Sequence, residues 1–516
     1  MRFLGRWGLS TVQSLCSESP SNAHALSSII MEDRACSQMN RLLSKTRLIN
    51  LCGTEHLKSR VQPVSSVSKD SPLTAYCKKR ASEMSNRRVA IVGAGAAGLC
   101  AARHIMAHSK HFASPVVFEQ TETVGGTWFY EDSEETQDSR RHVHSSMYRN
   151  LRTNLPKEVM MFPDFPFDAH LPSFLPHQDV QKYLERYCEH FAITPHIKFN
   201  TAVEEARPIA MEMDREKTMA WEVTTRDQHG TQNTETFDSV FICTGHYSDP
   251  HIPPIPGLQY FKGKVMHSHA YRRPEPFAGQ SVIVFGAGAS GLDISIELAK
   301  AMAQVMLSHG KPALTFSLPP GIQQAPPLSR VIEDGRVQFK DGSLVEAEVL
   351  MFCTGYNFSF PFLHPEQLHL DIRDHLVAPL YRFILPPAYP SLFFFGICKT
   401  ICPFPHFHCQ VQFALAVLDG TVKLPSREEM EREVQNMVDR KTAMGVLERH
   451  LLRMESEQWR YYQCLADSGG FSPLPPVIQS LYEEVARQRQ KHPQKYRNAN
   501  YRLVTDTQWE SIEKTH

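Results

Sequence analysis

The chain has 516 residues, 42% of them hydrophobic, and its 55 Lys and Arg residues balance its 55 Asp and Glu residues. A chain of this length and apolar content can bury large cores, which excludes a wholly disordered protein. The zero formal charge gives no global basic field of the kind that drives nucleic-acid binding. No stretch reaches the roughly 18 uninterrupted apolar residues of a membrane span. We therefore expect neither a nucleic-acid partner nor a transmembrane segment.

The 12 cysteines form no Cys-x-x-Cys pair and follow no regular spacing. Sulfur and imidazole ligands at high local density can hold zinc, but in the densest group Pro and Phe residues are interleaved, which favours an apolar loop packed on a core. We therefore expect no bound metal, and free thiols in a reducing compartment. That densest group is Cys398, Cys402, His406, His408 and Cys409.

Residues 1–85 differ in composition from the rest of the chain. They are rich in serine and carry 12 basic and 6 acidic residues, a net charge of +6, so the remaining residues carry −6. This leader is compatible with a transit peptide. We favour a disordered extension, or an upstream start that adds non-native sequence, because Met84 precedes the first strong structural signal. We expect a cytoplasmic protein; the alternatives are mitochondrial targeting by the extension and peripheral association with the endoplasmic reticulum membrane.

The first strong signal is an apolar strand over 87–92 that leads into a glycine-rich turn and a helical run over 99–108. A second apolar strand over 116–118 ends in Glu119. Strand, glycine turn, helix, strand and terminal acid make up the βαβ unit that binds dinucleotides. The glycines allow a tight turn, a close approach of backbone N–H groups to a pyrophosphate, and close helix packing, while the acid accepts hydrogen bonds from a ribose diol. The turn is Gly93-Ala94-Gly95-Ala96-Ala97-Gly98.

A second copy of this unit lies further along the chain. An apolar strand over 281–285 precedes the turn, a helix is expected over 292–302, and a strand over 304–307. Two dinucleotide sites in one chain indicate electron transfer between two bound cofactors, which narrows the pair to FAD and NADPH. The second turn is Gly286-Ala287-Gly288-Ala289-Ser290-Gly291.

The end of the second unit differs from the first, because no acid occupies the position that matches Glu119. An acid there would repel a 2′-phosphate, whereas Ser308, His309 and Lys311 can accept one. We therefore expect the second unit to bind NADPH rather than NADH. The alternative is that Lys311 is a solvated loop charge.

Disulfide reductases also carry two such units, but they need a redox cysteine pair after the first acid. This chain has Val124-Gly125-Gly126-Thr127-Trp128 there, and no cysteine follows until Cys188. Between the two units, residues 261–271 fit the pattern F-x-G-x-x-x-H-x-x-x-[YF]. With this fingerprint, the two turns and the segment Phe352–Tyr356, residues from about 86 to 430 resemble the flavin-containing monooxygenases, which oxygenate nitrogen and sulfur centres. Baeyer–Villiger enzymes have Trp at the last fingerprint position, where this chain has Tyr271.

The resemblance implies an α/β fold with two Rossmann-like dinucleotide-binding domains, the NADPH domain being inserted in the FAD domain. Residues 1–85 then form the extension and 86–250 the first part of the FAD domain. Residues 251–350 form the NADPH domain. Residues 351–516 form the second part of the FAD domain and a C-terminal helical region.

The family also has a Thr/Ser-Asn-x-Pro segment beside the flavin, which here is Thr153-Asn154-Leu155-Pro156. The resemblance implies that Asn154 faces the flavin ring and the nicotinamide ribose, and Asn154 is the one catalytic residue that we assign. An amide suits this role because it donates and accepts hydrogen bonds without titrating. The alternative is that Asn154 orders a loop before Pro156. The cofactor-binding candidates are Gly93, Ala94, Gly95, Ala96, Ala97, Gly98, Glu119, Thr127, Trp128, Thr153, Asn154, Leu155, Gly286, Gly288, Ser290, Gly291, Leu292, Asp293, Ser308 and Lys311.

One departure from the family pattern concerns the 2′-phosphate loop. Family members often have Arg there, where this chain has Gly310 and then Lys311. Because Arg can form a two-pronged contact with phosphate and Lys cannot, we expect a lower affinity or a shifted loop.

The expected function is NADPH- and dioxygen-dependent oxygenation of an amine or a sulfide through a 4a-hydroperoxyflavin. The cofactors supply the oxidising power, so no side-chain nucleophile or carboxylate pair is needed. Three alternatives remain open: an uncoupled NADPH oxidase that releases hydrogen peroxide, Baeyer–Villiger oxygenation of ketones, and a flavoprotein scaffold without turnover. No local motif identifies the substrate, and the sequence is compatible with a homo-oligomer.

Overall fold

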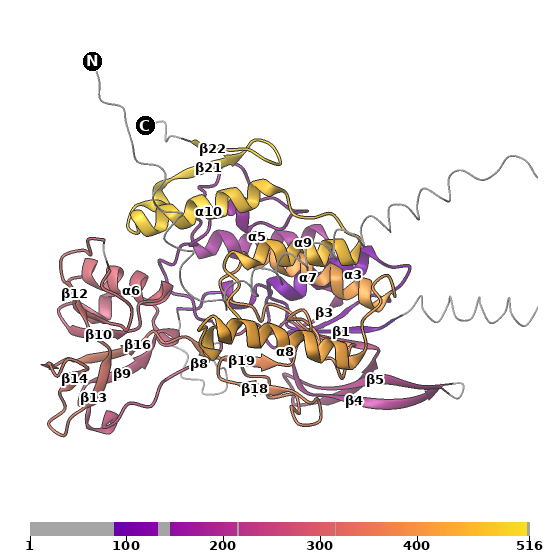
Figure 1. Cartoon of the computed structure of the whole chain (residues 1–516), viewed down its shortest axis with the longest axis horizontal. Coiled ribbons are helices and arrows are strands. Elements are labelled where there is room, and N and C mark those ends of the chain that lie inside the picture. The colour runs from indigo at the N-terminus through magenta and orange to yellow at the C-terminus, as the bar shows by residue number, and fades with distance from the viewer. Residues whose placement is uncertain (1–86, 133–144, 214–215, 315, 513–516) are drawn as a thin grey trace, which may run out of the picture. The chain divides into compact units, whose positions relative to one another are not determined.

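The computed structural model describes residues 87–132, 145–213, 216–314 and 316–512 (Figure 1). These residues belong to one unit of the chain, residues 75–516. The expected extension over 1–85 lies outside the described residues. This part of the chain contains two parallel sheets. In each sheet, one strand leads through a glycine turn into a helix.

The first parallel sheet has the strand order β20-β7-β1-β2-β3. Its central strand β1 is the expected strand before the first glycine turn, and all of its residues are buried. Parallel strands that are covered on both faces are continuous apolar runs, as β1 and β20 are. The strands are β1 Val89–Val92, β2 Val116–Phe118, β3 Ile197–Lys198, β7 Ser239–Ile242 and β20 Leu392–Phe394.

Three helices pack together beside the first sheet. The helix expected after the first turn is α3 (Ala96–Ala107), and it contacts both α5 (His177–His190) and α7 (Pro403–Leu418). The prediction of a loop at residues 398–409 is wrong over most of this range, because α7 begins at Pro403. The two prolines lie in the first turn of α7, where an N–H group has no partner within the helix in any case.

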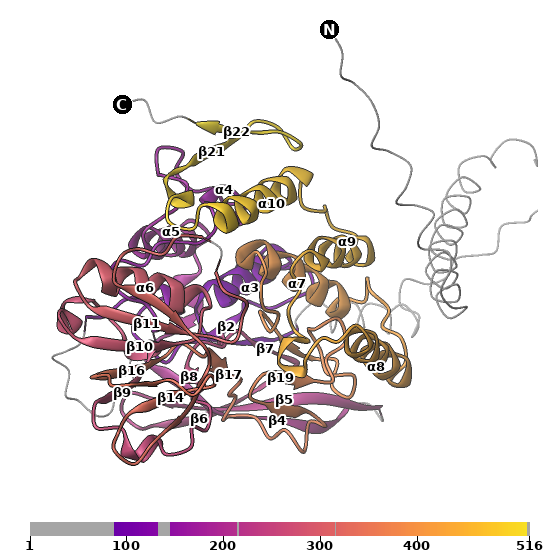
Figure 2. The same ribbon diagram turned by 60° about the vertical axis from the view of Figure 1, so that its left-hand side comes forward.

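The second parallel sheet has the strand order β12-β11-β10-β16-β9. Helix α6 (Ala289–Lys300) contacts β10, β11 and β12 and begins three residues before the expected helix (Figure 2). The strands are β9 Lys264–His267, β10 Ser281–Phe285, β11 Gln304–Ser308, β12 Ile322–Ala325 and β16 Val349–Phe352.

The second sheet is an insertion in the chain of the first, because all five of its strands come between β7 and β20. The chain leaves the first sheet through β8 (Asp249–Pro250) and returns through β17 (Tyr356–Asn357), and these two strands pair antiparallel. The expected division at 350/351 falls inside β16, which pairs with β10 along its whole length. The return therefore begins after Phe352.

Smaller antiparallel sheets and the C-terminal helices complete the described part of the chain. In both ribbon views α10 lies beside the hairpin of β21 and β22 (Figures 1 and 2). The smaller sheets are β4 Thr201–Met213 with β5 Glu216–Asp227 and β6 Gln232–Phe237; β13 Leu328–Val331 with β14 Val337–Phe339 and β15 Leu344–Val345; β18 Asp371–Arg373 with β19 Leu376–Ala378; and β21 Asn500–Leu503 with β22 Trp509–Ile512. The remaining helices are α4 Lys157–Met160, α8 Arg427–Ala443, α9 Glu457–Gly469 and α10 Pro476–Lys491.

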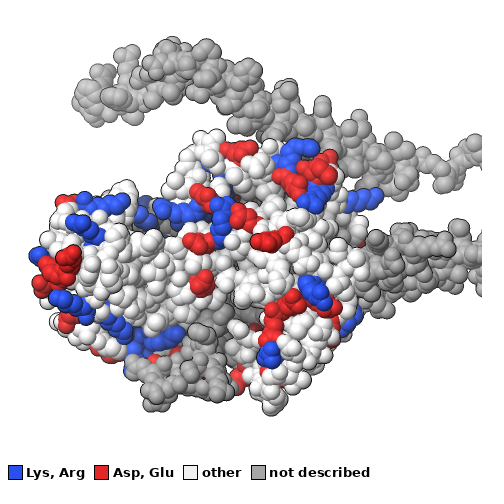
Figure 3. Space-filling view, turned by 90° about the horizontal axis from the view of Figure 1, so that it is seen from below, with Lys and Arg blue, Asp and Glu red and all other residues white. Residues whose placement is uncertain are grey.

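The surface carries charges of both signs. On the face seen in Figure 3, basic and acidic side chains are interspersed among wide uncharged areas. Several of the exposed charges form ion pairs, such as Arg207 with Glu222 and Arg336 with Asp334. Among the described residues, none of the helices combines the length and the apolar character that crossing a bilayer requires.

Candidate active site

The first glycine turn connects β1 to α3 and leaves no room for a side chain at two of its glycines. Gly93 has a φ of +102°, and a Cβ there would lie 2.8 Å from the carbonyl oxygen of Cys243. A Cβ on Gly98 would lie 1.9 Å from the carbonyl oxygen of Gly93. Because Gly95 is the N-cap of α3, the unpaired N–H groups of the first helical turn are at the end of the turn. This is the geometry that receives a phosphate at a helix N-terminus.

The carboxylate of Glu119 is buried at the end of β2 and is tied to the first turn. The Ala94 N–H donates to its Oε2 at 2.8 Å. The N–H and the hydroxyl of Thr121 donate to its Oε1 at 2.9 and 2.8 Å. These bonds fix an acceptor next to the turn, where a carboxylate can also accept from the hydroxyls of a ribose.

The segment from Gly125 to Trp128 lies against the same turn. The Gly125 N–H donates to the carbonyl oxygen of Ala94 at 3.1 Å, and residues Gly126–Trp128 form a 3₁₀ turn. A Cβ on Gly126 would lie 3.1 Å from the Cα of Gly95, so the two backbones touch. The Trp128 ring meets Phe404 of α7 edge to face, with 6.5 Å between the ring centroids. The predicted residues Thr127 and Trp128 are thus next to the first turn.

Thr153 fixes the segment that carries Asn154. The Thr153 N–H donates to the carbonyl oxygen of Leu175 at 2.8 Å, and its hydroxyl oxygen accepts from the Leu175 N–H at 3.0 Å. Asn154 itself is exposed, and its amide has no hydrogen-bond partner among the described residues. Thr153 therefore helps to order this loop, while the amide of Asn154 is not used for it.

Asn154 lies in a hollow that includes the first turns of α6, so the structure brings the predicted catalytic residue to the second glycine unit. The wall opposite α6 comes from the C-terminal part of the chain. We call this space the Asn154 hollow; its lining includes Asn154, Ala289, Leu292, Asp293, Arg489 and Arg497.

The second glycine turn repeats the constraints of the first. A Cβ on Gly286, whose φ is +117°, would lie 2.5 Å from the carbonyl oxygen of Cys353. A Cβ on Gly291 would lie 1.8 Å from the carbonyl oxygen of Gly286. Gly288 differs, because a Cβ there would meet nothing within 4 Å. The open space at Gly288 is where a ligand can approach the backbone closely.

The predicted 2′-phosphate residues have different surroundings. The hydroxyl of Ser308 is fully buried and donates to the carbonyl oxygen of Pro326 at 2.7 Å, so it does not face a ligand in this structure. His309 is also buried, and its Nε2 lies 3.3 Å from Oε1 of Gln324. The Lys311 ammonium donates to the carbonyl oxygen of Ala287 at 2.8 Å, which places its charge at the glycine turn.

The carboxylate of Asp293 has protein partners. The two terminal nitrogens of Arg497 donate to its two oxygens at 2.7 and 2.8 Å, and the hydroxyl of Tyr148 donates to its Oδ2 at 3.1 Å. The Arg497 Nε–H also donates to the carbonyl oxygen of Thr153 at 3.0 Å. Burial, together with the nearby Asp293, raises the pKa of Tyr148. Arg497 cannot be found from local sequence patterns, because its partner lies 204 positions away.

The fingerprint segment positions α6. Its last residue, Tyr271, is fully buried and donates its hydroxyl proton to Oε2 of Glu297 on α6 at 2.7 Å. Its histidine, His267, accepts a hydrogen bond from the His269 N–H at 3.0 Å. Burial lowers the pKa of His267 to about 4, so this imidazole is neutral at pH 7. The contacts of Tyr271 and His267 therefore support the fold, and the two residues do not form an acid–base pair.

The cysteine and histidine side chains at the start of α7 do not converge on one point, because each has a different neighbour. Cys402 donates its thiol proton to the carbonyl oxygen of Val159 at 2.7 Å, and His406 Nδ1 lies 3.2 Å from the hydroxyl of Tyr462. His408 pairs with His104 at 3.1 Å between ring nitrogens, and Asp164 lies within 4.8 Å of both. Asp164 also lies 2.6 Å from the Nε of Arg103, which neutralises it. The expectation of no bound metal stays a prediction.

Comparison with known proteins identifies the family. The profile described as flavin-binding monooxygenase-like matches residues 86–318 and 321–515. The chain belongs to this family. It is a flavin-dependent monooxygenase whose cofactors are FAD and NADPH.

Curated relatives and solved structures agree with this family. The monooxygenase is 36% identical over 436 residues to flavin-containing monooxygenase FMO GS-OX-like 4 of Arabidopsis thaliana, covering 81% of this chain and 95% of that one. S-allyl-L-cysteine S-oxygenase from Allium sativum has 36% identity and a TM-score of 0.73, covering 80% of this chain and 95% of that one. Tmm from Pelagibacter sp. strain HTCC7211 has 29% identity and a TM-score of 0.71, covering 83% and 96%.

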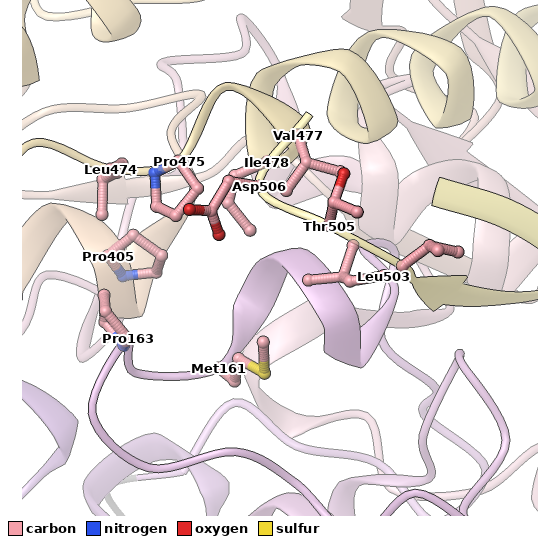
Figure 4. Close-up of a pocket in the computed structure, with 11 residues that line it drawn as sticks. Met161, Pro163, Pro405, Leu474, Pro475, Val477, Ile478, Leu503, Thr505 and Asp506 are labelled. Atoms are coloured by element: carbon pink, nitrogen blue, oxygen red, sulfur yellow. The ribbon is translucent and has the colours of Figure 1, made fainter. Parts of the chain in front are cut away.

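The monooxygenase also has an apolar hollow of about 310 Å³ next to α4 (Figure 4). Figure 4 shows Met161 and Pro163 on one side of it and residues of the C-terminal part on the other. Its volume is at the lower end of the range for small-molecule pockets. We call it the apolar hollow; its lining includes Met161, Pro163, Pro405, Ile478, Leu503 and Asp506.

The glycines of the second turn predict two different mutant phenotypes. Gly291→Ala forces a Cβ against the backbone and should lower the free energy of unfolding by about 1–3 kcal/mol. Gly288→Ala has room for its methyl group, so the fold should be unchanged. NADP⁺ should nevertheless bind about tenfold more weakly, since the methyl group occupies the approach to the backbone. Thermal unfolding measures the stability of each variant, and calorimetric titration measures its affinity for NADP⁺. Unchanged affinity in Gly288→Ala would show that the ligand does not approach the backbone at Gly288.

Proposed function

We propose that this monooxygenase uses NADPH and dioxygen to oxygenate soft nucleophilic sulfur or nitrogen centres. The single observation that carries the proposal is the placement of Asn154. Its amide, which has no partner among the described residues and follows the anchored Thr153, lies in a hollow with the start of α6. A neutral donor and acceptor at this position suits a group that must contact two cofactors without taking part in proton transfer.

In this proposal FAD binds the first glycine unit and NADPH the second. The flavin nucleotide is held by Gly93–Gly98 and Glu119, with Gly126–Trp128 beside it. The turn Gly286–Gly291, which includes Ser290, and the next residue, Leu292, hold the pyrophosphate of NADPH. The two domains follow as 86–250 together with the part after Phe352, and an inserted domain between them.

The bound flavin and nicotinamide supply the redox chemistry with dioxygen. The chain's own residues position the two cofactors and exclude water. Asn154 donates to and accepts from their polar edges. Glu119 holds a ribose in place, and Tyr271 keeps α6 in register through Glu297. The two acids in the middle of α6 already have protein partners, Asp293 in Arg497 and Glu297 in Tyr271, so neither is a free general base.

A sulfur centre is the first substrate class to test. The Allium sativum relative is named as an S-oxygenase, and thioethers are soft nucleophiles. The apolar hollow lies beside the segment that follows Asn154, and its mostly apolar lining suits a sulfide or an uncharged amine. The fold of cyclohexanone monooxygenase is related, with a TM-score of 0.52 at 17% identity, so ketone oxygenation is the second candidate.

Replacing the amide tests the role of Asn154. Asn154→Ser should leave a folded, flavin-loaded yellow protein but lower product formed per NADPH consumed by about tenfold, because one lost hydrogen bond to a cofactor costs about 1.4 kcal/mol. Product and hydrogen peroxide are measured in the same reaction. Asn233→Ser, on the distant strand β6, is the matched control. Unchanged coupling in Asn154→Ser would contradict the assignment.

The reaction class is tested with the unmodified protein. Oxygen uptake should depend on NADPH and should increase with a dialkyl sulfide or a tertiary amine, giving a sulfoxide or an N-oxide in step with NADPH loss. Peroxide in place of product would identify an oxidase, and ester formation from a cyclic ketone would identify Baeyer–Villiger chemistry. A protein that consumes no NADPH would be a scaffold.

A further inference from the structure

Two cations from separate parts of the chain, Lys311 and Arg489, lie near the second glycine turn. The ammonium of Lys311 reaches the carbonyl oxygen of Ala287 at 2.8 Å. Arg489, near the end of α10, lines the Asn154 hollow together with Ala289. Burial lowers the pKa of Lys311, and the positive charges of Arg453 and Arg489 lower it further. Arg489, which also lines the hollow at the start of α6, therefore adds to the positive field at Lys311.

The charge of Arg489 has no carboxylate partner within the part of the chain that the structure describes. Among the described residues, the side chains of Arg489 and Arg453 form no ion pair or hydrogen bond with a carboxylate. The nearest acid in the Asn154 hollow, Asp293, is already neutralised by the two-pronged contact of Arg497. By contrast, Arg487 on the same helix is paired with Glu484. Two cations that lie near one glycine turn without a carboxylate partner are stabilised when an anion binds between them.

The location indicates which anion. Helix α6 begins at Ala289, and its positive end adds to the local field. Gly288 leaves the backbone open to a ligand. The loop after β11 lacks the arginine that would form a two-pronged contact with phosphate, since Gly310 precedes Lys311. A phosphate monoester bound at this loop would contact the single ammonium of Lys311. A guanidinium that binds the same phosphate would have to come from another segment of the chain.

We propose that Arg489, on the C-terminal helix α10, joins Lys311 in binding the 2′-phosphate of NADPH. The C-terminal helical region then sets the cofactor preference of a turn that lies in the inserted sheet. The positive charge of Arg453 also lowers the pKa of Lys311, but the proposal requires no contact between Arg453 and the phosphate. This inference rests on the proposed binding of NADPH at the second unit, and it adds the residue that distinguishes NADPH from NADH there.

The experiment compares two ligands that differ only in the 2′-phosphate. Binding of 2′,5′-ADP and of 5′-AMP to the flavin-loaded full chain is measured by calorimetry, without turnover. Arg489→Ala should weaken binding of 2′,5′-ADP by about 10- to 100-fold, as expected for a lost charge-assisted contact. Binding of 5′-AMP should change less than twofold. Arg489→Lys should lie between the two proteins, because it keeps the charge but loses the two-pronged geometry.

The matched control is Arg487→Ala, two positions away on the same helix and exposed, which should bind both ligands like the unmodified chain. Equal weakening of both ligands in Arg489→Ala, or no weakening, overturns the role at the 2′-phosphate. If Arg489→Ala does not retain flavin, the ratio of the affinities for 2′,5′-ADP and 5′-AMP is measured in Arg489→Gln and Arg489→Lys instead. An unmodified chain that binds both ligands equally, and uses NADH as well as NADPH, would instead contradict the proposed assignment of the second unit.

Discussion

The contact between Arg497 and Asp293 holds the site together. The guanidinium of Arg497 binds both oxygens of Asp293 and the carbonyl oxygen of Thr153. It therefore connects a residue near the C-terminus to the helix of the second glycine unit and to the residue before Asn154. A two-pronged arginine–carboxylate contact fixes orientation as well as distance, which a single hydrogen bond would not. Partial burial reduces the screening of this pair by solvent.

Neighbouring contacts reinforce this arrangement. Arg152 donates to the backbone oxygen of Arg497 at 3.1 Å, and Tyr148 donates to Asp293. Tyr148 also packs edge to face against Tyr271, with 5.5 Å between ring centroids. Tyr271 in turn bonds Glu297, one helical turn beyond Asp293. The segment before Asn154 and the fingerprint segment thus bind adjacent turns of α6, which limits how α6 can move relative to Asn154.

The sequence predicted the features that depend on local order. Each βαβ unit is encoded within a short stretch, because glycine spacing and apolar runs decide the turn and the strands. Asn154 could be assigned only through the family resemblance, since an Asn two positions before a Pro has no distinctive pattern of its own. Contacts between distant segments were out of reach, and Arg497 and Arg489 belong to this class. The surroundings of Ser308 were out of reach for a related reason: its position at the end of β11 suggested a ligand contact, and only the structure shows that its hydroxyl donates to the carbonyl oxygen of Pro326. The start of α7 was also missed, because proline is read as a helix breaker although the first turn tolerates it.

The pairing of β8 with β17 has a consequence for how this architecture can vary. The N–H of His251 donates to the carbonyl oxygen of Gly355 at 2.9 Å, so the two ends of the inserted segment are hydrogen-bonded to each other. An insert whose ends meet imposes almost no separation on the strands that flank it, which is why such positions accept whole domains. The inserted segment between β8 and β17 can therefore be regarded as a separable unit of the chain. Replacing it by the corresponding segment of a relative should leave the pairing of β7 with β20 intact, if the incoming segment brings a carboxylate that pairs with Arg497.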